Sequence, residues 1–205
     1  MARRTKEEAE QTRKDILQAT LDMFCEKGYT HTTLDDIAKS INMTKGAVYW
    51  YFKNKPDILK GLMLEYFEKT CVKLDSYMSA PKNADELKRY FLFIAELVDT
   101  DLNFRKLLYF LFLQREWSTG LLNSFHDVIE ELTKRPIIAI EDALINAQKC
   151  GKIAPTLDVK QITYSIHAMW YGLLLGKLQN QETSLQDTVG YSFDFIKNAL
   201  ISRKD

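Results

Sequence analysis

The sequence has few of the residues that interrupt helices or cross-link a chain. Eight glycines and four prolines occur in 205 residues, and most of them fall where a helix is expected to end. The three cysteines, Cys25, Cys71 and Cys150, are far apart and odd in number. They form neither a metal-binding spacing nor a disulfide framework, so we expect buried thiols in a reducing cytoplasm.

Long apolar runs and an excess of charge are also missing. Wholly apolar runs such as residues 107–113 are too short to cross a membrane, and the charged N-terminal segment does not resemble a signal peptide. We therefore expect a cytoplasmic protein with no membrane partner. The 28 basic and 28 acidic residues balance, but residues 39–60 contain five lysines and a single acid, Asp57. This local basic segment fits an anionic partner.

The motifs of common enzyme sites are missing as well. The three histidines, His31, His126 and His167, lie far apart, and no phosphate-binding glycine loop or nucleophile elbow occurs. The paired acids at 130–131 and 141–142 are typical of solvated helix faces. We expect no enzyme activity, no cofactor and no metal.

Helical periodicity runs along most of the chain, and no strand alternation is found. The expected helices span about residues 5–27, 33–40, 44–52, 54–77, 84–99, 102–116, 121–149, 158–178 and 184–203. Pro136 lies inside the seventh of these and should kink or divide it. The pattern predicts an all-α fold: an N-terminal three-helix bundle, joined by a fourth helix to a larger bundle, with domains at 1–55 and 56–205.

The second and third helices have the features of a DNA-reading helix–turn–helix. Asn42 occupies the turn position that needs a left-handed backbone, and Thr44 can cap the third helix. Apolar or small residues occupy the positions where the two helices must pack together, namely Ile37, Ala38, Ile41, Met43 and Val48.

Residues 32–59, TTLDDIAKSINMTKGAVYWYFKNKPDIL, resemble the DNA-binding domain of the TetR family of transcriptional regulators along its whole length. The opening, MARRTKEEAEQTRKDIL, is most similar to the branch that represses multidrug efflux pumps. The resemblance is only general beyond residue 80, and it departs from the family at Asn42, where glycine is usual, and at Pro136. It implies a repressor that binds a palindromic double-stranded DNA operator as a homodimer. A small, largely apolar or aromatic ligand would release it, and the resemblance implies that the gene of an efflux transporter is the target.

Four consecutive aromatic residues at 49–52 must face all round a helix, so they cannot all belong to one core. Lys45 and Tyr49 share a face, and a lysine there can donate to guanine in the major groove. Phe52 should join the core, and Trp50 is expected to pack beneath the fourth helix.

The family resemblance and the residue chemistry together predict a set of DNA contacts. A glycine at position 46 costs about 1 kcal/mol relative to alanine in a helix, and the close approach of a base would explain why it is there. The predicted contacts are Thr33, Thr44, Lys45, Gly46, Tyr49, Tyr51 and Lys55. Either threonine could instead be an ordinary cap, and Lys53 a solvated charge. Arg3 and Arg4 could form a minor-groove arm or a disordered leader.

The last two helices are the predicted dimer surface. Residues 162–178 are apolar on more than one face, with Gly172 and Gly176 four apart, and a helix of this kind must be buried. The final helix is expected to contribute Val189, Phe193, Ile196 and Leu200.

The larger bundle is rich in aromatic residues at helical spacing, which is typical of plain core but also of a small-molecule site. The predicted ligand-binding residues are Met63, Phe67, Phe110, Gln114, Trp117, His167 and Tyr171. Ligand binding is expected to tilt the fourth helix and so change the spacing of the recognition helices. The alternative is a helical protein-interaction module without sequence-specific DNA binding.

Overall fold

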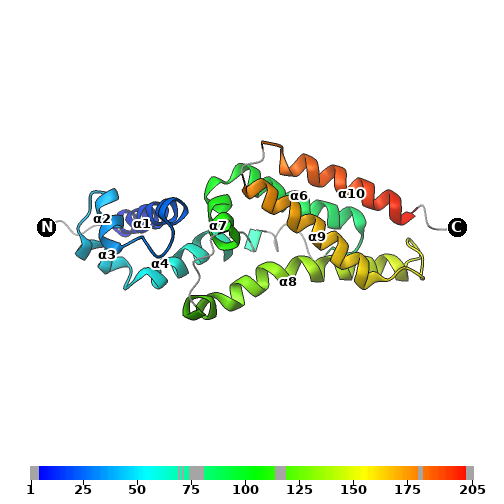
Figure 1. The fold of residues 1–205 in the computed structure, drawn as a ribbon, viewed down its shortest axis with the longest axis horizontal. Helices are drawn as coiled ribbons and strands as arrows, with labels where there is room; N and C mark the ends of the chain where they lie inside the picture. Colours follow the sequence, from blue (N-terminus) through cyan, green and yellow to red (C-terminus); the bar gives the residue numbers. More distant parts are fainter. Residues whose placement is uncertain are drawn as a thin grey trace. The chain divides into compact units, whose positions relative to one another are not determined.

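The computed structural model describes residues 5–68, 70, 72–73, 81–113, 119–179 and 182–201, with only the backbone at 67–68, 119–129, 131–133 and 201. All regular secondary structure in these ranges is helical, which confirms the all-α prediction (Figure 1). The chain forms two compact units: Met1–Thr70 with Lys106–Leu121, and Cys71–Arg105 with Leu122–Asp205. The expected functional boundary between residues 55 and 56 stays a prediction.

The first unit contains the expected N-terminal helices. They are α1 (Lys6–Lys27), α2 (Leu34–Ser40), α3 (Lys45–Tyr51), α4 (Lys55–Leu62) and the π-helix η1 (Met63–Glu68). The core of this unit includes Ile16, Leu17, Leu21, Phe24, Ile37, Val48, Phe52, Ile58 and Leu59. Helix α1 begins with a capping box, because Thr5 Oγ1 accepts from Glu8 N at 3.2 Å and Glu8 Oε2 accepts from Thr5 N at 2.9 Å.

The turn between α2 and α3 has the predicted geometry. Asn42 has φ 54°, the left-handed conformation that asparagine tolerates better than most residues. Met43 N donates to Ala38 O at 2.8 Å, which closes the end of α2. Thr44 then caps α3, with its Oγ1 accepting from Ala47 N at 3.2 Å. The helix–turn–helix prediction is confirmed.

Helix α4 begins as expected, because Asn54 Oδ1 accepts from Asp57 N at 2.9 Å. Its α-helical part is shorter than predicted: it ends at Leu62, and six residues with π-helical bonding follow. Gly61 lets α4 approach its neighbours closely, since a Cβ there would lie 2.9 Å from Phe52 Cε1 and 3.0 Å from Leu17 Cδ2.

Among the described residues, the second unit contains three whole helices, all but the first turn of a fourth, and the start of α7 (Leu102–Leu113), whose later residues belong to the first unit. The four are α6 (Ala84–Thr100), α8 (Thr119–Lys149), α9 (Val159–Leu178) and α10 (Leu185–Ile201). Helix α10, red in Figure 1, packs along α6 and α9. None of the helices that the structure describes is both long and apolar enough to cross a membrane.

Pro136 does not divide α8, which was one of the two outcomes expected from its sequence position; a kink stays a prediction. The helix continues from Thr119 to Lys149 with Pro136 inside it. A proline removes one backbone hydrogen bond, but the bonds on either side remain. Buried Ala139, Ile140 and Ala143 follow directly, and their packing holds the helix together.

One carboxylate joins three helix ends in the second unit. Asp99, near the end of α6, lies 2.8 Å from Lys177 Nζ of α9 and accepts at 2.9 Å from Gln186 N in the first turn of α10. Both charged side chains are largely buried, at 16% and 14% exposure. Burial by itself raises the pKa of Asp99, but the hydrogen bonds from Lys177 and from two backbone N–H groups outweigh it, so that pKa is lowered.

We expect Asp99→Asn to destabilise the folded protein by about 2 kcal/mol at neutral pH, because the largely buried Lys177 ammonium would lose its counter-charge and keep only its hydrogen bond to Thr183 O. Because the pKa of Asp99 is lowered in the folded protein, its carboxylate contributes fully to the free energy of unfolding above the unfolded pKa of about 4. This contribution is lost as the pH falls through the folded pKa. Urea unfolding between neutral pH and acid measures both effects, and the difference between variant and wild type should shrink in acid. Glu96→Gln, an exposed change in the same helix, should stay within about 0.5 kcal/mol.

Candidate functional site

The exposed face of α3 brings together the residues predicted to read bases. Lys45, Gly46 and Tyr49 are all exposed, while Val48 on the opposite side is fully buried. The Lys45 ammonium lies 6.0 Å from the centre of the Tyr49 ring. A cation and a phenol therefore project from one short helix that is anchored on its other side, which suits insertion into a groove.

Trp50 does not pack beneath α4, and that prediction is wrong. Its side chain is 74% exposed, and its ring meets the Tyr51 ring edge-on, with centroids 4.6 Å apart. The expectation for Phe52 is confirmed at 4% exposure. Trp50 lies four residues after Gly46, so helical spacing already placed it on the exposed face, and the sequence reasoning missed that signal.

The two threonines differ in how their hydroxyl groups are used. Thr33 Oγ1 accepts from Asp36 N at 3.1 Å and donates to Asp36 Oδ2 at 2.6 Å, which completes a capping box. The hydrogen bonds from the Thr33 side chain and backbone lower the pKa of Asp36. Among the described residues, the Thr44 hydroxyl has no acceptor for its own hydrogen. The Thr44 hydroxyl is therefore available to donate to a phosphate. At Thr33, only the backbone N–H groups at the start of α2 can do so.

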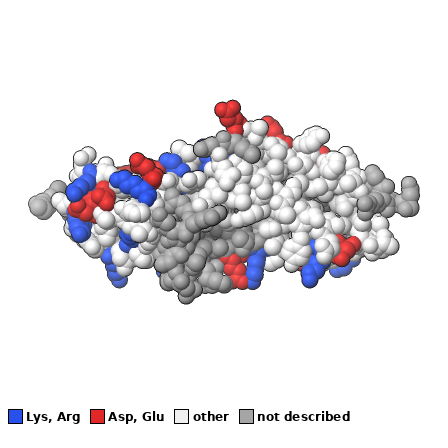
Figure 2. Space-filling model, in the orientation of Figure 1, with Lys and Arg blue, Asp and Glu red and all other residues white. Residues whose placement is uncertain are grey.

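Lys55 is held by the loop between α1 and α2. Its ammonium donates to Tyr29 O at 2.7 Å and to Thr30 O at 3.3 Å, and it lies 4.4 Å from the centre of the Tyr29 ring. The lysine therefore fixes the start of α4 to the loop that leads into α2. Its positive charge stays half-exposed at this edge of the unit. Lys and Arg side chains, interspersed with acids, gather around α2 and α3 in Figure 2.

Gly46 has no packing reason to be a glycine within the described chain. A Cβ at this position would meet nothing within 4 Å, and its φ is not positive. A helical glycine costs about 1 kcal/mol relative to alanine, and no contact inside the protein offsets that cost.

The predicted ligand-binding residues are distributed over both units. Met63 and Phe110 are buried in the first unit, where the Phe110 ring stacks on Phe24 with centroids 5.2 Å apart. In the second unit, the half-buried rings of His167 and Tyr171 lie 6.2 Å apart, and burial lowers the pKa of His167. The Phe67 side chain, Gln114 and Trp117 lie outside the described residues. The ligand-binding roles stay predictions.

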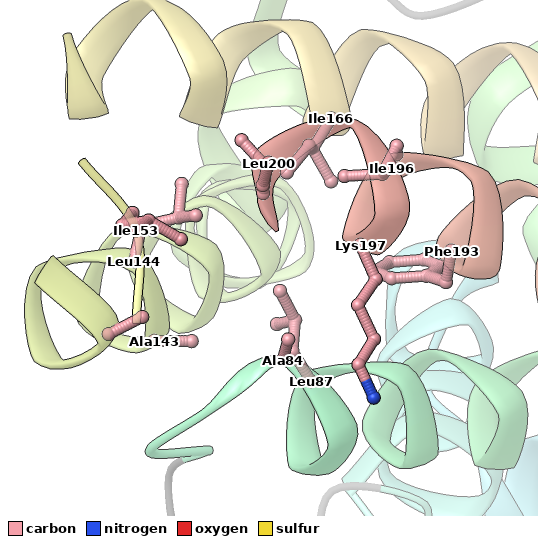
Figure 3. A pocket seen from close by; sticks show the side chains of 11 residues that line it. Ala84, Leu87, Ala143, Leu144, Ile153, Ile166, Phe193, Ile196, Lys197 and Leu200 are labelled. Carbon is pink, nitrogen blue, oxygen red and sulfur yellow. The ribbon is translucent and has the colours of Figure 1, made fainter. Parts of the chain in front are cut away.

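The second unit also contains an apolar cavity of about 30 Å³ that the sequence reasoning missed (Figure 3). It lies among α6, α8, α9 and α10, and its lining includes Ala84, Leu87, Ala143, Ile166 and Leu200. Lys197, the charged lining residue, directs its ammonium to Asp85 Oδ1 at 2.6 Å. The space holds one or two small groups, so the cavity as observed does not accept a drug-sized molecule.

The first half of the apolar stripe of α10, which was expected to form a dimer surface, faces the interior instead. Val189 is fully buried and Phe193 is 5% exposed, while Ile196 and Leu200 line the cavity. The prediction is wrong for Val189 and Phe193, because this part of the stripe packs against α6 within the same chain. For Ile196 and Leu200, which are half-exposed, it stays a prediction.

The exposed apolar residues of these two helices are different ones. Tyr191 and Phe195 on α10 are 78% and 68% exposed, and Tyr164 on α9 is 51% exposed. Gly172, on the same helix, is open to solvent. Figure 2 shows a broad stretch with few charged side chains in the region of α6, α9 and α10.

Comparisons with known proteins agree with this architecture. Residues 16–62 match the family model described as "Bacterial regulatory proteins, tetR family". The "Probable HTH-type transcriptional regulator ArpR" of Pseudomonas putida is 30% identical over 187 residues, which are 85% of this chain and 83% of that protein. The regulator TtgR of Pseudomonas putida is 46% identical over 63 residues, which are 31% of this chain and 30% of TtgR.

Solved structures show the same fold. NalD of Pseudomonas aeruginosa, titled "the secondary repressor of MexAB-OprM multidrug efflux pump", superposes with a TM-score of 0.74 at 23% identity, covering 98% of this chain and 100% of that one. A "SmeT-Triclosan complex" superposes with a TM-score of 0.70 at 22% identity, covering 92% and 90%.

The helix–turn–helix with its exposed α3, followed by a larger helical unit, defines a regulatory protein of the helix–turn–helix class. The family match and the relative that aligns along most of the chain identify it further. This chain belongs to the TetR family of bacterial regulatory proteins.

Proposed function

We propose that the chain is a transcriptional repressor that binds a palindromic operator as a homodimer and is released by a small, largely apolar or aromatic ligand. The observation that carries the proposal is the exposed face of α3, where Lys45, Gly46 and Tyr49 project from a helix whose other side is buried. The unexplained glycine supports a partner whose surface comes very close to the backbone. The major groove of DNA is such a partner.

The phosphate contacts of this interface come from the elements that surround α3. Thr44 supplies a hydroxyl donor at the start of α3, and Thr33 supplies the helix end of α2. Tyr51 lies half-exposed on α3, and its side chain adds a contact to the backbone of the DNA. Lys55 adds its charge and also holds the loop that leads into α2. These residues position the helix, and Lys45 reads the bases.

The dimer forms through the exposed aromatic side chains of α10 and the open side of α9. Tyr191 and Phe195 are four residues apart and share a face. On α9, Tyr164, Ala168 and Gly172 follow one another at intervals of four, and all are exposed. The small residues let a helix of a second copy approach α9 closely. Helices α9 and α10 of the two copies then bury the exposed aromatic rings between them. The dimer then places two copies of α3 one DNA turn, about 34–36 Å, apart.

Ligand release works through the contacts between α4, η1 and the end of α3. Glu65 of η1 lies 3.9 Å from Arg13, and the Arg13 guanidinium lies 5.6 Å from the centre of the Phe52 ring. Gly61 brings α4 against the same ring. A ligand that displaces Met63 would shift η1, and these contacts would carry the shift to Phe52, directly after α3. The similarity to NalD, titled as a repressor of a multidrug efflux pump, favours a transporter gene as the target.

Lys45→Ala should lower the preference for the selected operator over a scrambled duplex by about tenfold, because one base-reading donor is lost. Lys55→Ala should weaken binding to both duplexes alike and reduce the salt slope by about one, because it removes a backbone contact. Titration of labelled duplexes at several salt concentrations measures both quantities.

Lys14→Ala removes the same charge from an exposed position on α1 and serves as the control, with both duplexes bound nearly as by wild type. A chain that binds no duplex even in dilute salt contradicts the proposal. That result would favour the alternative of a helical protein-interaction module.

A further inference from the structure

Trp50 is the most exposed large apolar side chain of the helix–turn–helix. At 74% exposure its indole is more open than the Tyr49 ring, which is 46% exposed. No DNA-contact role was expected of it. A tryptophan side chain is seldom this exposed on a well-packed helix. Aromatic residues in such positions commonly anchor a partner.

The indole is held in place before any partner binds. Its edge-on contact with the Tyr51 ring, at 4.6 Å and 82°, has the geometry that aromatic pairs prefer. Little side-chain freedom is therefore lost when a partner contacts it. A ring with a fixed orientation can discriminate between neighbouring bases, whereas a disordered ring cannot.

Trp50 extends the groove-facing surface in one direction. In a helix with 100° per residue, Gly46 and Trp50 lie four residues apart on one face, next to the face of Lys45 and Tyr49. The missing side chain at Gly46 leaves room beside the indole, since nothing lies within 4 Å of its Cβ position. A groove surface that meets Lys45 therefore also meets Trp50 on the far side of that gap.

The chemistry of the indole indicates what it contacts. Its faces and edge are apolar except for one N–H donor, so it cannot make the paired hydrogen bonds that identify guanine or adenine. The apolar feature of the major groove is the 5-methyl group of thymine. We propose that Trp50 is a specificity-determining residue that reads thymine methyl groups in each operator half-site, beside the base read by Lys45. This inference rests on the proposed DNA-binding function.

The test removes methyl groups one at a time without changing the base pairing. An operator is first selected from a pool of random duplexes with the wild-type chain, and each thymine is then replaced singly by deoxyuridine. Wild type should lose about fourfold in affinity at one or two positions of each half-site, the size expected for one buried methyl group. Trp50→Ala should bind the parent operator more weakly and show no loss at those same positions.

Two further variants separate the indole from its neighbours. Trp50→Phe keeps an apolar ring and should retain most of the methyl sensitivity, whereas Lys45→Ala should keep it in full while losing base preference. Equal methyl sensitivity in wild type and Trp50→Ala overturns the inference, as does a wild-type chain that is insensitive to every replacement. If wild type enriches no duplex at all, the proposed function itself fails, and this inference fails with it.

Discussion

Phe195→Asp should convert the dimer to a monomer and lower operator affinity by roughly 10²–10⁴-fold. The Phe195 side chain is 68% exposed within the chain, so an aspartate there costs the folded monomer little. In the proposed dimer the same position is covered, and a carboxylate without a partner would be buried in an apolar surface. The large loss in DNA binding follows because two linked recognition helices bind with a high effective concentration that a single one lacks. Sedimentation and duplex titration measure the two effects.

Leu102→Asp is the matched control for this prediction. Leu102 is also apolar, is 51% exposed and belongs to the same compact unit, but it lies at the start of α7 and outside the proposed surface. The same substitution there should leave both the dimer and operator binding intact. A Phe195→Asp chain that remains dimeric would show that α10 does not form the interface. Val189→Asp is unsuitable as a test, because Val189 is fully buried and its loss would unfold the unit.

The sequence predicted helix positions well because their signals are local. The capping residues Thr5, Thr33, Thr44 and Asn54 all cap the helices expected of them. Asn42 adopts the left-handed backbone that the turn requires. Each of these signals acts within four residues along the chain, so a single sequence contains them in full.

The errors arose where two helical faces compete for burial. The stripe of Val189 and Phe193 has the right spacing for any apolar contact, and the sequence does not tell whether the contact is with α6 or with a second chain. The aromatic rings at 191 and 195 form the second face, and tyrosine and phenylalanine occur in both settings. Trp50 was misplaced for the same reason, because an aromatic residue beside a core position was taken to share the core.

The π-helical bonding of η1 was not predicted, because no residue type marks it. Residues 63–68 have an ordinary helical composition, and the change of hydrogen-bonding pattern at Leu62 depends on packing. Tyr66 OH reaches Gln18 at 3.3 Å and Glu65 approaches Arg13, so both contacts tie η1 to α1. π-Helical turns are frequent at functional sites, which agrees with the proposed role of η1 in ligand release.

Two helical glycines of the first unit should respond in opposite ways to the same substitution. Gly61→Val should destabilise the unit by about 3 kcal/mol, because the new side chain would overlap Phe52 and Leu17 in a filled core. Gly46→Val should leave stability within about 0.5 kcal/mol, since valine is no worse than glycine in a helix and its side chain meets nothing within 4 Å. Urea unfolding of both variants checks this difference.

Operator binding should show the opposite order, with Gly46→Val the more damaging substitution in the folded protein. Gly46→Val should fold like wild type and still lose operator binding by at least about tenfold, because its methyl groups stand between the helix backbone and the bases. Gly61→Val should lose binding only in proportion to its unfolded fraction, so low temperature should restore part of it. A Gly46→Val chain that binds the operator as tightly as wild type would mean that the groove does not approach α3 at this residue. DNA recognition would then not explain why position 46 carries a glycine, which costs about 1 kcal/mol relative to alanine in a helix.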